Sequence, residues 1–145
     1  LAVILKVHAA WVNCTNPLGR ADLSGYDLRT VDLERADLRR AIIEGADLTG
    51  ANLTGADLSR ADLRAATLTG ANLTNANLTD ANLTDADLTS VSAYDADLTN
   101  ADLTNADLTD AYLTGSTLTG VTWLNTTCPT GIVQNTECPT ESGTG

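Results

Sequence analysis

Few residues in this 145-residue chain could carry out chemistry. There is one histidine, His8, and there are three cysteines, so general acid–base or nucleophilic catalysis has little material. A zinc site needs more ligands than two neighbouring cysteines and a distant His8 provide. The sequence also contains no glycine-rich phosphate loop and no histidine cluster. The residues therefore predict a protein that is not an enzyme and that holds no metal and no cofactor.

Carboxylates are the abundant ionisable groups. Asp and Glu number 19 against 8 Lys and Arg, which gives a formal net charge of −11. Such a charge repels nucleic acid and anionic membrane surfaces, so neither is an expected partner. All eight basic residues lie before position 65, and ten acidic residues with no basic one follow. One interpretation of this asymmetry is drift of a repeat. The other is that opposite ends attract, which would favour head-to-tail association of the protein or docking on a basic partner.

The acidic residues belong to a five-residue repeat. From Ala21 to Gly120 the chain contains twenty consecutive units without an insertion. The first residue is Ala in sixteen units, the second is Asp or Asn in fifteen, and the fourth is Thr or Ser in fourteen. The third residue is Leu in eighteen units, with Ile43 and Ala93 as the exceptions. These leucines are the predicted core: Leu23, Leu28, Leu33, Leu38, Leu48, Leu53, Leu58, Leu63, Leu68, Leu73, Leu78, Leu83, Leu88, Leu98, Leu103, Leu108, Leu113 and Leu118.

A period of five fits neither a helix nor a straight strand. Leucines five apart drift around a helix, and they fall on alternating faces of a strand. The period makes sense if the backbone turns a corner once per unit, so that the first and third residues point inward. Turn-tolerant residues at the fifth place, such as Gly50 and Asn75, would supply the bend. In the unit that begins with Val91, a larger first residue offsets the small Ala93, which indicates conserved core volume.

The units resemble the Ala-(Asp/Asn)-Leu-X-X motif of the pentapeptide-repeat family, for example Ala46-Asp47-Leu48-Thr49-Gly50. The resemblance covers residues 21–120 and implies an all-β fold, a right-handed four-sided β-helix of about five coils. Residues twenty apart should then stack, so that Asp27 lies near Asp47 and Glu44 pairs with Arg64. Stacked acids leave weak cation binding open, whereas the stacked threonines are interpreted as ordinary outward residues rather than an ice-binding array.

The ends of the solenoid must hide its core. We expect an N-terminal apolar cap segment at 1–18, the repeat at 19–125, and a disulfide loop with a polar tail at 126–145. Residues 1–12 are too short to span a bilayer. They are interpreted as a helical cap, with an export-signal remnant or a contact with a neighbouring molecule as alternatives. Trp11 and Trp123 are the predicted end caps.

The two Cys-Pro-Thr turns at Cys128 and Cys138 look like the ends of a disulfide-closed loop. Similar cysteine-bearing tails occur on exported members of the family, so the resemblance favours an oxidising, extracytoplasmic location (secreted, periplasmic or lumenal). Cys14 is left over, with a buried position, a free thiol and an intermolecular bond as the alternatives.

Three functions remain. The first is a structural or protein-binding module whose partner the sequence does not identify. The second is a rod that stacks end to end into oligomers or filaments. The third is an acidic mimic of DNA that binds a topoisomerase such as gyrase, as some members of the family do. The arginines in the first half of the chain count against the third.

Overall fold

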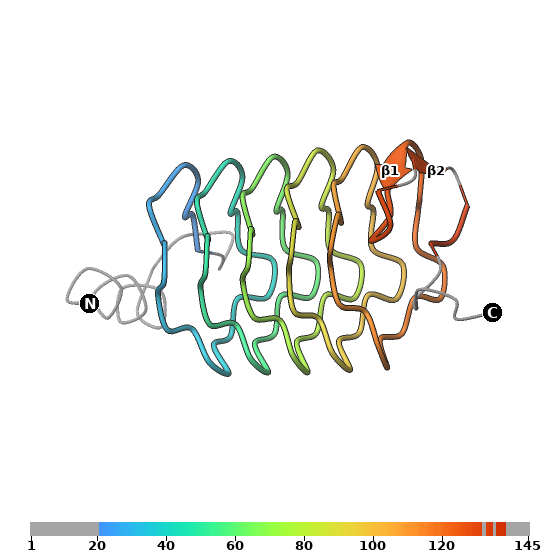
Figure 1. Cartoon of the computed structure of the whole chain (residues 1–145). Helices are drawn as coiled ribbons and strands as arrows, with labels where there is room; N and C mark the ends of the chain where they lie inside the picture. The colour runs from blue at the N-terminus through green and yellow to red at the C-terminus, as the bar shows by residue number, and fades with distance from the viewer. Residues whose placement is uncertain (1–20, 132, 135, 139–145) are drawn as a thin grey trace.

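The computed structural model of the protein describes residues 21–131, 133–134 and 136–138. They form a rod of stacked coils that runs from residue 21 at one end to the C-terminal segment at the other (Figure 1). Each unit makes one parallel backbone bridge to the unit twenty residues later, from Asp22 with Ile42 to Asp107 with Thr127. Four five-residue units therefore complete one coil. The described residues form no helix.

Each unit belongs to one of four faces, which we number in chain order. The first face holds the units that begin at 21, 41, 61, 81 and 101, and the second holds those that begin at 26, 46, 66, 86 and 106. The third holds those that begin at 31, 51, 71, 91 and 111, and the fourth holds those that begin at 36, 56, 76, 96 and 116. The first and third faces are opposite each other, as are the second and fourth.

The backbone hydrogen bonds follow the same period. The third residue donates to the next coil, as in Leu48 N–H to the Thr67 carbonyl at 2.7 Å. The fifth residue does so too, and the second donates to the preceding coil, as in Asp47 N–H to the Tyr26 carbonyl at 3.0 Å. A bond within the turn, Ala51 N–H to the Leu48 carbonyl at 2.9 Å, closes each corner. The coils thus satisfy one another's polar groups, as a stable buried backbone requires.

The first and third residues of the units fill the interior, as the period of five predicts. Of the predicted core leucines, all but Leu33 are buried, and Leu33 is partly buried and packs against the same cluster. Val91 is 0% and Ala93 2% exposed, so the unusual unit keeps both places inside. Burying one leucine contributes roughly 1.5–3 kcal/mol, and the coils repeat this contribution along the rod.

The fifth residue of every unit from 25 to 125 has a left-handed backbone, with φ from +53° to +78°. Glycine, asparagine and aspartate tolerate this conformation, but Ala65 and three arginines adopt it as well. The bonds between coils must therefore impose the corner on residues that would avoid it alone.

The corner strain gives a first prediction, on two glycines. At Gly70 a Cβ would meet nothing within 4 Å, so Gly70→Ala should cost only the unfavourable φ, roughly 1 kcal/mol. At Gly115 the Cβ would lie 2.1 Å from the Asp95 Oδ1 atom, but this atom is the outer end of an exposed side chain that can rotate away, so Gly115→Ala should cost only slightly more. Urea denaturation of both variants measures the difference. A loss at Gly115 several times that at Gly70 would contradict this freedom of the Asp95 side chain.

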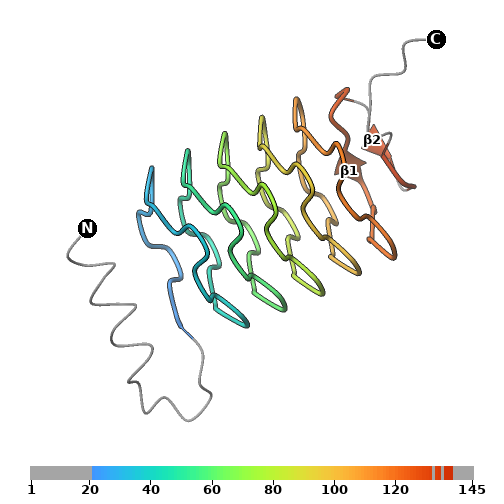
Figure 2. The same cartoon turned by 90° about the horizontal axis from the view of Figure 1, so that it is seen from below.

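The repeating backbone pattern continues beyond Asn125, which is the residue where the sequence analysis predicts the end of the repeat. Thr126 and Cys128, both 0% exposed, occupy the places of Ala and Leu, because both side chains are small enough for the interior. Strand β1 (Thr126–Thr127) then pairs antiparallel with β2 (Val133–Gln134). The chain therefore folds back at this end instead of adding another parallel unit (Figure 2). The predicted N-terminal cap segment at 1–18, with its helix at 1–12, lies outside the described residues. The number of coils in the whole chain therefore stays a prediction.

Candidate binding surface

The outward second residues clamp the turns. Asp102 accepts hydrogen bonds from the Thr104 N–H at 3.0 Å and from the Thr104 hydroxyl at 2.6 Å. Asn82, one coil earlier, accepts the same two bonds from Thr84 at 3.0 and 2.7 Å. Asp and Asn do the same structural work here, because each offers an oxygen to the backbone two residues ahead.

These bonds stabilise the ionised form of several aspartates. The Thr49 hydroxyl and then the Thr49 N–H lower the pKa of Asp47, and the same groups of Thr99 lower the pKa of Asp97. At the N-terminal half, the Arg29 guanidinium forms two hydrogen bonds with Asp27, at 2.8 and 2.6 Å, and lowers the pKa of Asp27 to about 2.

The lowered pKa values predict how stability depends on pH. Because each folded pKa lies below the ordinary value of 3.8, the stabilisation is complete above that value and is lost as pH falls toward the folded pKa. We therefore expect the midpoint temperature of thermal unfolding to decrease when the pH is lowered below about 4. The variant Asp47→Asn/Asp97→Asn keeps the turn bonds without titrating, so its midpoint should drop less. An equal drop in both proteins would contradict this assignment.

The other predicted neighbours also stack. The bridges place Asp27 beside Asp47, as expected, and the Arg64 Nη2 atom lies 2.8 Å from the Glu44 carboxylate, which confirms the predicted Glu44–Arg64 pair. Arg64 also contacts Asp62 at 2.7 Å. Arg29, Arg39 and Arg64 thus pair with carboxylates on the surface, where such pairs contribute little stability.

The corner residues form ladders between coils. On the corner after the first face, the Asn105 amide donates to Asp85 at 2.9 Å, and the Asn125 amide donates to Asn105 at 3.0 Å. On the corner after the fourth face, Asp80 accepts from the Asn100 amide at 3.2 Å and lies 3.4 Å from the Arg60 Nε atom. These corner carboxylates are already engaged by neighbours.

The third face differs from this pattern. Tyr94 and Tyr112, from adjacent coils, stack with ring centroids 5.9 Å apart and an interplanar angle of 25°. The two tyrosine residues are still 39% and 54% exposed. Asp110 lies at the corner before this face and Asp95 at the corner after it, and both are exposed. Within the described part of the chain, neither carboxylate has a side-chain hydrogen bond or an ion pair.

Sequence analysis did not identify this pair. The signal is available once the coil length is known, because positions 94 and 112 fall on one face of adjacent twenty-residue coils, at a fourth and a second place. Stacking residues twenty apart does not pair the two tyrosines, because they are eighteen residues apart and stand at different places of their units.

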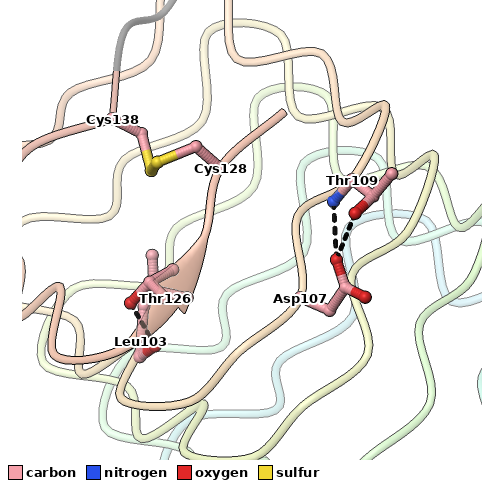
Figure 3. The surroundings of a disulfide bond; sticks show 6 residues. All are labelled: Leu103, Asp107, Thr109, Thr126, Cys128 and Cys138. Carbon is pink, nitrogen blue, oxygen red and sulfur yellow. Dashed lines mark hydrogen bonds between the residues drawn. A yellow bond between two sulfur atoms is a disulfide. The ribbon is translucent and has the colours of Figure 1, made fainter. Parts of the chain in front are cut away.

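At the C-terminal end, the Cys128 and Cys138 sulfur atoms are bonded, with Cα atoms 5.4 Å apart (Figure 3). Both cysteines are buried, at 0% and 1% exposure, and they belong to the core cluster. The nearby Thr126 hydroxyl, also buried, donates to the Leu103 carbonyl at 2.7 Å. The disulfide thus lies over the end of the core rather than in a loop outside it.

The remaining predicted site residues are the two tryptophans. Trp123 is 6% exposed and packs in the core cluster at the third place of its unit. Trp11, like Cys14, lies outside the described residues. Among the residues that the structure describes, no group of three or more His, Cys, Asp or Glu is arranged to hold a metal ion. In the same ranges we find no helix with the length and apolar character needed to cross a membrane.

Comparison with known proteins shows the family. The family profile for pentapeptide repeats matches residues 18–55, 56–92 and 81–120, in eight copies. No curated protein matches the chain. The crystal structure of a pentapeptide repeat protein, Rfr23 from the cyanobacterium Cyanothece 51142, is similar with a TM-score of 0.60 and 28% identity over 72% of this chain and 82% of that chain.

Two further solved structures are similar to this chain, with lower TM-scores. HetL of Nostoc sp. strain PCC 7120, involved in heterocyst differentiation regulation, is 33% identical over 79% of this chain and 65% of its own, with a TM-score of 0.37. A pentapeptide repeat protein from the Arabidopsis thaliana thylakoid lumen is 33% identical over 70% and 64%, with a TM-score of 0.28. This chain spans less than two thirds of either protein. By its repeats and its coils, the chain belongs to the pentapeptide-repeat family of right-handed β-helices.

Proposed function

We propose that this protein is a non-catalytic binding module whose partner is another protein, held against the outer faces of the rod. The observation that supports this most is the order of the surface. Side chains such as those of Thr99 and Thr104 are fixed by hydrogen bonds to Asp97 and Asp102 before any partner arrives. A surface ordered in advance loses little conformational entropy on binding, which favours affinity.

The location that we propose is extracytoplasmic. The Cys128–Cys138 disulfide supports it, because disulfides persist in oxidising compartments and are rare in the reducing cytosol.

The two alternatives have less support. End-to-end stacking needs an open edge, but β2 occupies the edge of β1 and the disulfide lies over the same end. A DNA mimic is supported by the net charge alone, and in the first half of the rod Arg29, Arg39 and Arg64 pair with the carboxylates.

Photo-crosslinking tests the proposed function. A photoreactive residue is placed at one fourth position per face, Thr104, Thr89, Thr74 or Thr79, and each variant is irradiated in an extracytoplasmic extract of the source organism. We expect an adduct with one other protein from one face, and excess unlabelled protein should compete it away. Adducts only with a second copy would support self-assembly instead, and the absence of a competed adduct from all four faces would overturn the proposal.

A further inference from the structure

We propose that the third face is the docking surface for an extended cationic segment of the partner protein. The surface consists of Tyr94 and Tyr112, bordered by Asp95 and Asp110, and we call it the tyrosine surface. The inference rests on the proposed function, because it names the chemistry of the partner that the module would bind.

The tyrosine rings supply the contact area. The chain has three tyrosines and no phenylalanine, and two of the three stack on this face. Their second and fourth places are elsewhere filled mostly by Asp, Asn and Thr. Stacked rings that stay about half exposed offer a rigid face to a ligand, and a guanidinium or ammonium group is attracted to such a face.

Hydrogen bonds between coils fix the backbone that carries both rings. The Tyr112 N–H donates to the Val91 carbonyl at 2.9 Å, and the Tyr112 carbonyl accepts from the Ala93 N–H at 2.9 Å. The Tyr94 carbonyl accepts from the Asn75 N–H at 2.8 Å. Both tyrosines therefore project from backbone that is hydrogen-bonded to the preceding coil, so binding would not have to order this part of the chain.

The two carboxylates give the surface its charge preference. The aspartates at comparable corners, Asp80 and Asp85, are held in ladders by asparagine amides. Asp95 and Asp110 have no such partner among the described residues, although both are exposed. The Asp95 carboxylate lies over Gly115, the corner of the same coil that carries Tyr112, so it is directed along the border of the ring pair.

Charge complementarity identifies the occupant. No basic residue follows position 64, so nothing in this half of the sequence neutralises the border of the tyrosine surface. A segment that crosses the face from corner to corner would place one cationic side chain near Asp110 and another near Asp95, with the rings between them. An extended chain with basic residues separated by a small spacer fits this arrangement, and an acidic or purely apolar segment does not.

Peptide binding tests the inference. The probe is an eight-residue peptide of alternating Arg and Ser with blocked ends, titrated into the intact protein and followed by isothermal calorimetry. The Asp95→Asn/Asp110→Asn variant should bind about tenfold more weakly, and Tyr94→Thr/Tyr112→Asn should lose at least as much. The first pair places asparagine at corners, as the repeat does at Asn75 and Asn100, and the second uses residues common at those places, so the fold should be preserved.

The control removes two charges on the opposite side. Asp85→Asn/Asp102→Asn changes the net charge equally but leaves the third face intact, so its affinity should change less than twofold. If both double aspartate variants lose the same affinity for the peptide, the effect comes from net charge alone and the inference is overturned. Binding of a peptide of alternating Gln and Ser with the same affinity as the Arg/Ser peptide would also overturn it. If photo-crosslinks to the partner form only on another face, the inference fails while the proposed function stands, and if they form on no face, the proposed function itself fails.

Discussion

Leu78→Ala is expected to lower the free energy of unfolding by about 2–5 kcal/mol. Leu78 is 0% exposed and lies in the centre of the fourth face, between Leu58 and Leu98 in the neighbouring coils. The coils above and below are fixed by backbone hydrogen bonds, so they can relax only partly into the space that the leucine leaves. Urea denaturation with linear extrapolation measures the loss.

The unusual unit on the third face supplies the matched control. Ala93→Leu alone adds volume beside the buried Val91 and should cost about 1–3 kcal/mol. Adding Val91→Ala restores the common Ala and Leu pattern, so the double variant should lose less than about 1.5 kcal/mol. If the effects of Ala93→Leu and Val91→Ala simply add, the first and third residues of a unit do not share one volume. A loss below about 1 kcal/mol for Leu78→Ala would argue against a tightly packed core.

The core could be predicted from sequence because one property, burial, repeats at a fixed period. With eighteen leucines at the third place and sixteen alanines at the first, few backbone arrangements bury both sets of side chains away from water. The number of sides, four, came from the family resemblance, because a period of five does not determine it. Once a coil has twenty residues, pairs such as Glu44 with Arg64 follow from spacing alone, and the structure has this pair at 2.8 Å.

The corners and the C-terminal end were harder to predict because neighbouring coils determine them. Ala65 and Arg60 would not be expected in a left-handed conformation from local preference, yet both adopt it with their N–H groups bonded to the next coil. Thr126 and Cys128 do not match the motif, but both side chains are small enough for the interior. The backbone therefore continues in the register of the repeat at this unit, with Thr127 bridged to Asp107. Tertiary hydrogen bonding overrode the local signal in both cases.

The residues at the second place of the units show that the turn does not depend on a negative charge. Asn82 and Asp102 accept the same two bonds from the threonine two residues ahead, so the turn needs an oxygen and not a negative charge. The excess of aspartate after residue 64 is therefore not required by the fold. At the corners, Asn75 and Asn100 adopt the same left-handed conformation as Asp95 and Asp110, so substitution of these two aspartates by asparagine should likewise preserve the coils.

Cys128→Ala/Cys138→Ala is expected to lower the free energy of unfolding by roughly 3 kcal/mol. The bond closes a loop across a sequence separation of 10 residues, and chain-entropy arguments give about this value for a loop of that size. Because both sulfur atoms lie in the core cluster, the smaller alanines also remove contacts at the end of the rod. Urea denaturation measures the total loss.

The loss should be concentrated at the C-terminal end, because each coil is stabilised mainly by its neighbours. The Leu108 N–H donates to the Thr127 carbonyl at 2.8 Å and the Asp110 N–H donates to the Pro129 carbonyl at 3.0 Å, so both amides depend on the segment that the disulfide holds. Hydrogen exchange at these amides should accelerate in the variant, while the Leu68 N–H, bonded to the Asp87 carbonyl at 2.7 Å in the middle of the rod, should exchange as before. Equal acceleration at all three amides would mean that the rod unfolds as one unit and that the disulfide stabilises the whole of it rather than closing one end.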